Sequence, residues 1–268
     1  MKHEFVPYFI QCITNMHVGS GDANYGVVDK LVQRDPVTNY PTIHPSSLKG
    51  ALREHFEQQP GWEKGSDNIN TIFGKKANGG SDSETGEYKF LGADLVTLPV
   101  RCNFQQFVMA LNSTQADLLN QKAKLLVSKK IFENIDAATK LFFKANEPGY
   151  DVFAEDIKIT SKVVHQKVSK ANSCLISFDE KYASFTDEDF KTITKNLPVI
   201  ARNYIEDGTS ENLWYEEIVP HQSVFLTFIA ETATLKSEFE NILNDTIVQI
   251  GGNATIGYGL CKFHKVTF

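Results

Sequence analysis

Ile250-Gly-Gly-Asn-Ala-Thr-Ile-Gly-Tyr-Gly-Leu260 is the most informative stretch of this 268-residue chain, because four glycines fall within nine positions between two apolar runs. A glycine cluster of this density is typical of turns with positive φ, or of a close approach by a second backbone. Its N–H groups can equally cradle a phosphate. Taken alone, the stretch leaves both a hairpin turn and a phosphate-binding loop open.

Two polar elements near the N-terminus favour the phosphate interpretation. The first is Met16-His-Val-Gly-Ser-Gly-Asp22, and the second is Pro45-Ser-Ser-Leu-Lys-Gly-Ala-Leu-Arg53. The second predicts a helix from an N-cap at Ser46 or Ser47 to about residue 58, with Lys49 and Arg53 one turn apart. Its N-terminus suits a phosphate, although an ordinary capped helix with solvated basic side chains fits the same pattern. Three phosphate-compatible elements in one chain indicate a nucleic-acid ligand.

Composition restricts the alternatives. The net charge of −6 and the pI near 5.7 argue against a generic nucleic-acid binder. Residues 101–170, however, carry eleven Lys/Arg against seven Asp/Glu, so a local basic groove remains open. No stretch approaches the roughly 20 apolar residues of a membrane span, and the N-terminus lacks a signal-peptide profile. Four scattered cysteines without zinc-type spacing predict free thiols and a cytoplasmic location.

The order of elements predicts an α+β fold with an antiparallel sheet. Strands are expected at 5–18, 90–96, 104–111, 197–205 and 223–230, and helices at 114–133 and 235–244. The first of these helices is expected to bury Leu118, Leu119, Leu125 and Leu126. A further helix begins after Thr186, the N-cap, with Phe185 and Phe190 as a hydrophobic staple.

The whole chain, residues 1–268, is interpreted as a single domain. The segment 60–90 is rich in Gly, Ser, Asn and charged residues, which is typical of a long mobile insertion. The basic, β-prone residues near 150–175 predict a protruding hairpin. No internal repeat accompanies these features.

Three groups of side chains are candidates for chemistry. Asp29 follows a flexible glycine-containing segment and is either a turn residue or a functional carboxylate. His17 ends the first expected strand and is either a structural histidine or a catalytic acid. In Asn212-Leu-Trp-Tyr-Glu-Glu217, aromatic residues precede two carboxylates, which suits base stacking with metal contact, or a core anchor with solvated acids. Dinucleotide-loop, P-loop, nucleophile-elbow and zinc-protease motifs are absent from the sequence.

Together these motifs resemble the RAMP superfamily of CRISPR proteins. The resemblance is carried by His17-Val-Gly-Ser-Gly21, Gly26-Val-Val-Asp29, the Ser46–Arg53 element and the glycine-rich stretch at 251–259. Leu197-Pro-Val-Ile-Ala-Arg202 and Leu213-Trp-Tyr-Glu-Glu217 are similar to the backbone subunit of type III-B (Cmr) effectors. The match spans about residues 7–264, and the segment 60–90 matches nothing known in the family.

This resemblance implies an RRM-like (ferredoxin-like) palm, with insertions described as finger and thumb. It implies a subunit that binds guide crRNA, stacks head-to-tail with copies of itself and with other Cmr subunits, and cuts complementary target RNA at regular intervals. Such a subunit is a metal-dependent endoribonuclease within the assembled complex, with Mg²⁺ or Mn²⁺ as cofactor. No membrane partner is implied.

The resemblance also assigns roles to residues. Asp29 stands at the position of the cleavage aspartate and, as a carboxylate, is the candidate metal ligand. His17 and one of Glu216 and Glu217 correspond to secondary active-site positions. Guide binding without sequence readout is expected from Gly19, Ser20, Gly21, Ser46, Ser47, Lys49, Arg53, Gly251, Gly252, Gly257, Tyr258 and Gly259.

Three other functions stay open at this point. The backbone subunit of the sister type III-A complex shares the loop aspartate. A non-catalytic structural RAMP subunit binds guide RNA but generally lacks that aspartate. A stand-alone crRNA-processing endonuclease of the same superfamily uses a histidine as general acid.

Overall fold

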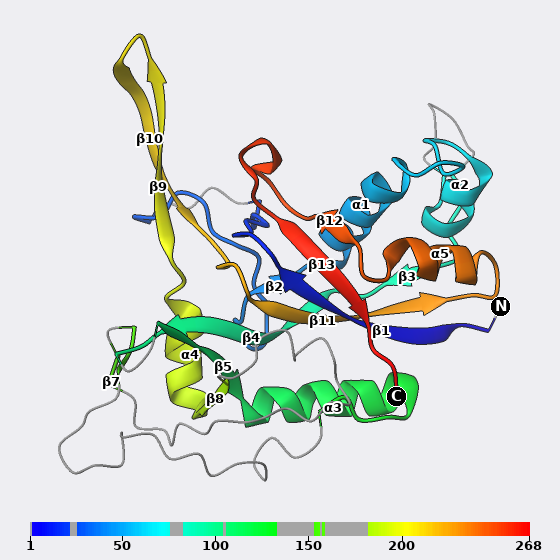
Figure 1. Ribbon diagram of the computed structural model, residues 1–268, viewed down its shortest axis with the longest axis horizontal. Helices are drawn as coiled ribbons and strands as arrows, with labels where there is room; N and C mark the ends of the chain where they lie inside the picture. Colours follow the sequence, from blue (N-terminus) through cyan, green and yellow to red (C-terminus); the bar gives the residue numbers. More distant parts are fainter. Residues whose placement is uncertain are drawn as a thin grey trace.

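A mixed but mainly antiparallel sheet forms the centre of the molecule in the computed structural model (Figure 1). The structure describes residues 2–21, 26–75, 83–103, 106–132, 153–155, 157–158 and 182–268. Its four central strands lie in the order β13 (Leu260–Lys265), β1 (Glu4–Cys12), β11 (Val224–Glu231) and β4 (Ala93–Arg101), each antiparallel to its neighbours. The expected α+β class with an antiparallel sheet is confirmed at this level.

Shorter strands extend the sheet at both ends. Strand β12 (Ile247–Gln249) pairs with β13, and β5 (Phe107–Asn112) pairs with β4. Strand β8 (Tyr182–Phe185) then adds to β5 in parallel. Strands β2 (Thr42–Ile43) and β3 (Lys89–Phe90) pair with β4 and β11. Because both faces of β1 and β11 are buried, the two strands read as nearly continuous apolar runs.

Helices cover both faces of the sheet (Figure 1). Helices α1 (Pro45–Phe56) and α5 (Lys236–Leu243) meet on one face, where Phe56 stacks on Phe239 with ring centroids 4.7 Å apart. Helix α3 (Ser113–Val127) packs on the other face, in a cluster that includes Phe9 and Phe228. Alternate residues of β1 therefore face two separate cores, as the period of a strand requires.

Of two expected helix starts, the one before α4 (Asp187–Lys195) is confirmed and the serine N-cap expected for α1 is not. Helix α4 (Asp187–Lys195) begins as predicted, since the Thr186 side chain accepts the Asp189 N–H and both Phe185 and Phe190 are buried. Helix α1 begins at Pro45 and not after a serine cap, with His44 at the N-cap position and no side-chain cap bond. Proline suits the first helical position because its missing N–H is unpaired there anyway.

The expected buried face of α3 was wrong at two leucines. Leu118 and Leu125 are 46% and 86% exposed. The helix instead buries Gln115, Ala116 and Leu119, together with Ala123. Small side chains let the helix approach the sheet closely, which a row of leucines prevents.

The segment expected as a loop insertion at 60–90 contains helix α2 (Asp67–Phe73), capped by the Ser66 side chain. Trp62 and Ile69 are buried in the same core as α1 and α5. Ile69, Ile72 and Phe73 have the i, i+3, i+4 spacing of a buried helix face, a local signal that the polar composition of the whole segment obscured. Residues 76–82 lie outside the described residues.

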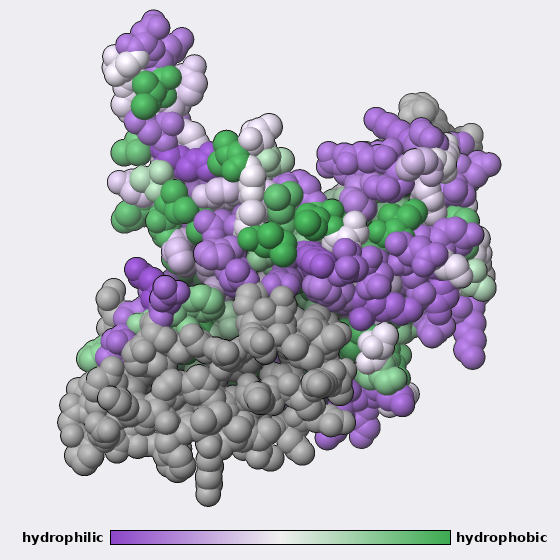
Figure 2. Space-filling model, viewed as in Figure 1, coloured by the Kyte–Doolittle hydropathy of each residue, from purple (hydrophilic) through white to green (hydrophobic). Residues whose placement is uncertain are grey.

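A long hairpin of β9 (Val199–Glu206) and β10 (Thr209–Glu217) protrudes from the body of the molecule (Figure 1). Its turn is Asp207-Gly208, with positive φ at both residues. Apolar side chains remain exposed along it, including Ile205 at 62% and Leu213 at 54% (Figure 2). The protrusion was expected near 150–175; there the structure describes only the short pair β6 (Phe153–Ala154) and β7 (Ile157–Lys158), and the remainder lies outside the described residues.

Candidate functional site at the base of the hairpin

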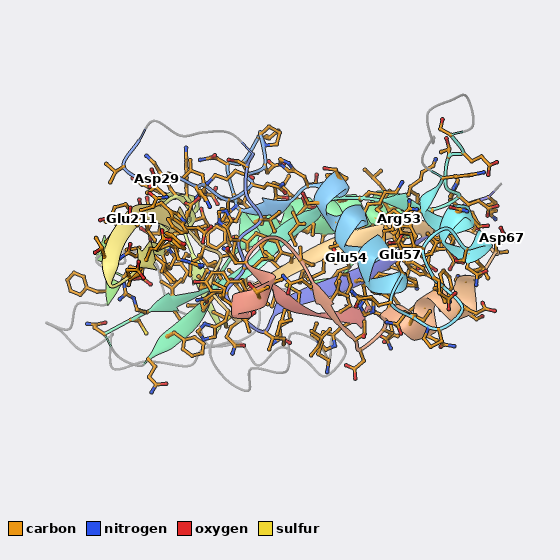
Figure 3. The ribbon with its side chains drawn as sticks, turned by 90° about the horizontal axis from the view of Figure 1, so that it is seen from above. Asp29, Arg53, Glu54, Glu57, Asp67 and Glu211 are labelled. Carbon is orange, nitrogen blue, oxygen red and sulfur yellow. The ribbon has the colours of Figure 1, made fainter. Side chains whose placement is uncertain are left out.

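Asp29 lies against the base of the hairpin, next to the Leu-Trp-Tyr-Glu-Glu strand that is 186 residues away in sequence (Figure 3). Its N–H donates to the Tyr215 carbonyl at 3.0 Å, and the Tyr215 N–H donates to Asp29 Oδ2 at 2.7 Å. The ladder continues with a parallel bridge between Lys30 and Glu216. The Asp29 side chain is exposed, with one oxygen engaged by the strand and the other unbonded within the described structure. The geometry thus presents one carboxylate oxygen of Asp29 to solvent.

His17 and Glu216 form a second, buried part of the same region. Glu216 Oε1 lies 3.6 Å from His17 Nε2, and the two side chains are 2% and 8% exposed. His17 Nδ1 lies 2.7 Å from the Glu217 carbonyl oxygen. Because a carbonyl only accepts hydrogen bonds, Nδ1 carries a hydrogen and Nε2 is the atom that faces Glu216. Asn253, from the glycine-rich loop, donates to Glu216 Oε2 at 2.8 Å.

The neighbouring carboxylate, Glu217, is occupied by structural contacts. Arg34 Nη2 lies 2.5 Å from Glu217 Oε1, and the Val32 N–H donates to Oε2 at 3.0 Å. Since both oxygens are bonded and the residue is buried, Glu217 holds the 30–34 segment against the hairpin. Of the two candidate glutamates, Glu216 is therefore the one that faces His17.

The expectation of a core anchor with solvated acids was wrong for the Leu213–Glu217 stretch. Glu216 and Glu217 are the buried residues, at 2% and 5% exposure. Trp214 is only half-buried, and Lys30 Nζ lies 5.1 Å from its ring centroid. The sequence could not indicate this inversion, because the cations that allow the acids to be buried, such as Arg34, come from distant segments.

The structure brings the predicted residues to one region without joining all of them. In the described part of the chain, no hydrogen bond or ion pair links Asp29 to His17, Glu216 or Glu217. Asp29 contacts the hairpin through the Tyr215 backbone, one position before Glu216. Asp29 and His17 therefore contact adjacent residues of β10, Tyr215 and Glu216.

The glycine-rich loop serves mainly to support His17. Gly251 has a φ of +86°, and a Cβ there would lie 2.4 Å from the His17 carbonyl oxygen. The N–H groups of Gly252, Gly257 and Gly259 donate to carbonyl oxygens of His17, Ala254 and Asn15, respectively. These donors are thus already used, which removes the simplest form of the expected phosphate cradle. Phosphate binding by this loop, Tyr258 included, stays a prediction.

The polar loop before Asp29 is paired in a similar way. Gly19 forms an antiparallel bridge with Val32, and the Ser20 N–H donates to the Leu31 carbonyl at 2.9 Å. Gly21 is exposed, with a φ of +87°. Residues 22–25 lie outside the described residues.

The two basic side chains of α1, Lys49 and Arg53, differ in their contacts. Arg53 donates to Glu57 Oε1 at 2.8 Å and to the Gly74 carbonyl at 2.9 Å, so its guanidinium ties α1 to the end of α2. Lys49 is half-buried, and its side chain forms no hydrogen bond or ion pair with the described residues. Figure 3 shows Asp29 at the hairpin end of the molecule and Arg53 toward the other end.

The two serines at the start of α1 also differ. Ser46 is exposed, whereas Ser47 Oγ accepts a hydrogen bond from Gln33 Nε2 at 2.9 Å. Gln33 Oε1 in turn accepts the His44 N–H at 2.7 Å. Gln33 therefore fixes the start of α1 against the segment that follows Asp29.

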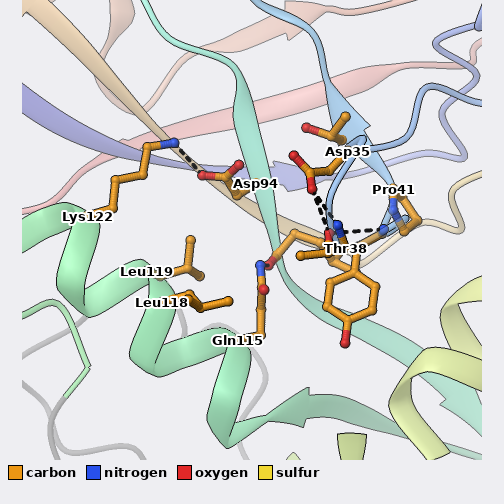
Figure 4. A pocket seen from close by; sticks show the side chains of 11 residues that line it. Asp35, Thr38, Pro41, Asp94, Gln115, Leu118, Leu119 and Lys122 are labelled. Atoms are coloured by element: carbon orange, nitrogen blue, oxygen red, sulfur yellow. Dashed lines mark hydrogen bonds and ion pairs between the residues drawn. The ribbon is translucent and has the colours of Figure 1, made fainter. Parts of the chain in front are cut away.

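A separate pocket of about 180 Å³ lies between the 35–42 segment, β4 and α3 (Figure 4). Its carboxylates are already paired, Asp94 with Lys122 at 2.6 Å and Asp35 with N–H and hydroxyl groups of its own turn. These bonds lower the pKa of Asp35 although partial burial opposes them. With both of its carboxylates already paired, the pocket is a poor candidate for catalysis.

Comparison with known proteins identifies the class of this fold and site. The family model of the RAMP superfamily matches residues 9–262, which is nearly the whole chain. A solved structure of the type III-B Cmr-beta assembly in its apo state contains a chain of the same fold, with a TM-score of 0.78, 23% identity and 98% of each chain covered.

Two curated relatives narrow the class. The CRISPR system CMR subunit Cmr4 of Saccharolobus solfataricus is 36% identical over 298 residues, covering 96% of this chain and 94% of the relative. The CRISPR system Cmr endoribonuclease Cmr4 of Pyrococcus furiosus is 27% identical over 274 residues, covering 93% and 92%. The chain therefore belongs to the RAMP superfamily and, within it, to the Cmr4 subunits of CRISPR systems. This confirms the type III-B resemblance over the type III-A alternative.

The helices in the described ranges include none with the length and apolar character needed to cross a membrane. Among the described residues, Cys12, Cys102 and Cys261 form no disulfide.

Proposed function

We propose that this chain is the backbone subunit of a type III-B CRISPR effector, which binds guide crRNA and cleaves complementary target RNA at regular intervals. The observation that carries the proposal is the exposed Asp29 carboxylate held at the root of a protruding hairpin. A Cmr4 relative is named an endoribonuclease, which supports the activity for this chain. The assembly acts in the cytoplasm.

The central sheet supports an RRM-like palm. Taken in chain order, β1, β4, β11 and β13 are its four strands, and they lie in the spatial order β13-β1-β11-β4. Helix α1 falls between the first and second of them, and α5 between the third and fourth. This is the βαββαβ arrangement of a ferredoxin-like fold, with other elements as insertions. The β9–β10 hairpin then serves as the thumb.

The thumb also suits stacking of copies along a guide. Val199, Ile205, Leu213 and Tyr215 leave apolar surface exposed on a two-stranded hairpin, which is marginal by itself in water. An apolar face of this kind is covered when a partner packs on it. Guide RNA, target RNA, further copies of this chain and other Cmr subunits are the proposed partners.

Asp29 is placed to act on a splayed linkage of the target. In the proposed reaction the 2′-oxygen attacks the adjacent phosphorus, its proton passes to a base, and the 5′-oxygen leaves with a proton. Asp29 is the exposed group that can accept the proton of the 2′-hydroxyl or orient that hydroxyl. His17 and Glu216 lie buried behind it and shape the backbone that carries it.

The metal proposed for the reaction fits a minimal site. The described residues contain no group of three His, Cys, Asp or Glu side chains able to hold an ion. Mg²⁺ commonly binds through one carboxylate together with phosphates and water, and the unbonded oxygen of Asp29 meets that need. When bound, Mg²⁺ or Mn²⁺ neutralises charge that develops on the phosphate.

Reconstitution with guide RNA, the other Cmr subunits and labelled target tests the proposal. We expect regularly spaced products on a denaturing gel, ending in 2′,3′-cyclic phosphates, and none with a non-complementary RNA. An intact target in a complex that binds it would indicate a structural subunit. Specific single-site cleavage of precursor crRNA by the protein alone would indicate a processing enzyme.

A further inference from the structure

The Arg202 guanidinium of β9 lies within cation–π distance of two aromatic rings at the base of the hairpin. Its guanidinium carbon is 6.0 Å from the Trp214 ring centroid and 5.6 Å from that of Tyr258. Lys30 approaches the Trp214 ring as well, at 5.1 Å. These contacts join the Asp29 segment, the two strands of the hairpin and the glycine-rich loop.

The same guanidinium faces the buried carboxylate of the candidate site. Arg202 Nη1 lies 3.6 Å from Glu216 Oε2, and the Glu216 side chain is 2% exposed. A buried carboxylate needs a compensating positive charge, and arginine keeps its charge at every pH at which the protein folds. His17 lies 3.6 Å from the other oxygen of Glu216. Arg202 thus supplies the permanent charge on one side of Glu216 and leaves His17 on the other.

We propose that Arg202 is a positioning residue for RNA cleavage, which acts through Glu216 and is itself held by Trp214 and Tyr258. The proposal rests on the proposed function. Its geometry requires a planar cation, because a guanidinium can stack on two rings while its edge faces a carboxylate. Lysine carries the charge without that plane, so the two variants Arg202→Gln and Arg202→Lys separate charge from stacking.

The kinetic test uses the reconstituted complex. We expect Arg202→Gln to lower kcat by about tenfold or more, with KM and target-RNA affinity within about twofold of wild type, since the residue acts behind the reacting groups. The kcat of Arg202→Lys is expected to lie between those of the wild type and Arg202→Gln. Lys236→Gln, which removes a lysine paired with Glu4 elsewhere, is the matched control for the loss of one positive charge. Loss of affinity in place of kcat, or a wild-type rate in Arg202→Gln, would overturn the proposal.

A double-mutant cycle tests the route of action. If Arg202 works through Glu216, Arg202→Gln should cause no further loss of kcat in a Glu216→Gln background. Multiplying losses would show that Arg202 acts independently, which contradicts the proposal. A wild-type complex that binds target without cutting it would overturn the proposed function and this role together.

A spectroscopic measurement tests the stack without any activity. The chain has two tryptophans, so Trp62→Phe leaves Trp214 as the single reporter. In that background Arg202→Gln should change the intensity and move the emission maximum of Trp214, and Lys236→Gln should not. Unchanged emission would overturn the stack even if cleavage fell. A shift in emission in a protein that never cleaves would locate the failure in the proposed function.

Discussion

Replacement of Asp29 separates catalysis from structure, because the carboxylate has one visible structural task. Its Oδ2 accepts the Tyr215 N–H at 2.7 Å at an exposed position. Losing such a bond costs about 0.5–1.5 kcal/mol. A change of about 1 kcal/mol lowers Tm by roughly 2–4 °C in a chain of this size. Asp29→Ala should show that loss, whereas Asp29→Asn keeps an amide oxygen for the same N–H and should stay near wild type.

The cleavage rate should depend on the negative charge of the Asp29 side chain and not on its hydrogen bond with the Tyr215 N–H. If Asp29 handles the 2′-hydroxyl or a metal, both variants should lose about 10²–10⁴-fold in cleavage rate, while target binding stays nearly intact. Denaturing gels of labelled target with Mg²⁺ or Mn²⁺ measure the rate, a gel shift measures binding, and thermal unfolding measures stability. A normal rate in Asp29→Asn together with a slow Asp29→Ala would refute the catalytic assignment and make Asp29 a hairpin anchor.

Three further predictions follow from single contacts. In Gly259→Ala the new Cβ would lie 2.1 Å from the Ile250 carbonyl oxygen, at a φ of +74°. Urea unfolding should show that this variant loses about 2–5 kcal/mol of unfolding free energy. The control Gly257→Ala has a similar φ of +80° but open space around the Cβ, and should lose only about 1 kcal/mol. Burial raises the pKa of Glu231 from 4.5 to about 8, so the folded state keeps a proton that the unfolded state releases. As the pH rises from 5 to 8, the unfolding free energy of the wild type should therefore fall relative to that of Glu231→Gln, by up to about 1.4 kcal/mol per pH unit. A difference between the two proteins that stays constant with pH would contradict this prediction. Lys49→Ala should weaken guide binding and flatten its salt dependence, whereas Arg53→Ala should mainly lower Tm; equal salt slopes for Lys49→Ala and wild type would remove Lys49 from the RNA interface.

The elements that the sequence predicted well have local causes. The start of α4 depends on Thr186 and its neighbours within four residues, and those contacts formed as expected. The β9–β10 hairpin was not predicted, although a local signal existed for it. Asp207-Gly208 is a two-residue turn of the type that joins twisted hairpin strands, and both residues have positive φ. The expected strand at 197–205 corresponds to β9, and no partner strand was predicted after the turn.

The site was harder to predict because its contacts are long-range. Asn253 and Arg202 both stand in stretches that carry the family resemblance, yet nothing in those stretches indicates that both meet Glu216. The glycine-rich loop shows the same limit. Its glycines suggested a ligand, whereas at Gly251 the close neighbour is the His17 backbone of the protein itself.

The choice between Glu216 and Glu217 shows what alternation along a strand can and cannot decide. Neighbouring residues of a strand point to opposite faces, so the pattern alone indicates that only one of the two can face His17. Which one is decided by cations from elsewhere in the chain. Arg34, which is 183 residues from Glu217 in sequence, places its Nη2 atom 2.5 Å from Glu217 Oε1. The carboxylate oxygens of Glu216 lie 3.6 Å from Arg202 Nη1 and 3.6 Å from His17 Nε2. Asn253 also donates to Glu216 Oε2 at 2.8 Å, so both carboxylates are held in the folded protein, but only Glu216 is held next to His17.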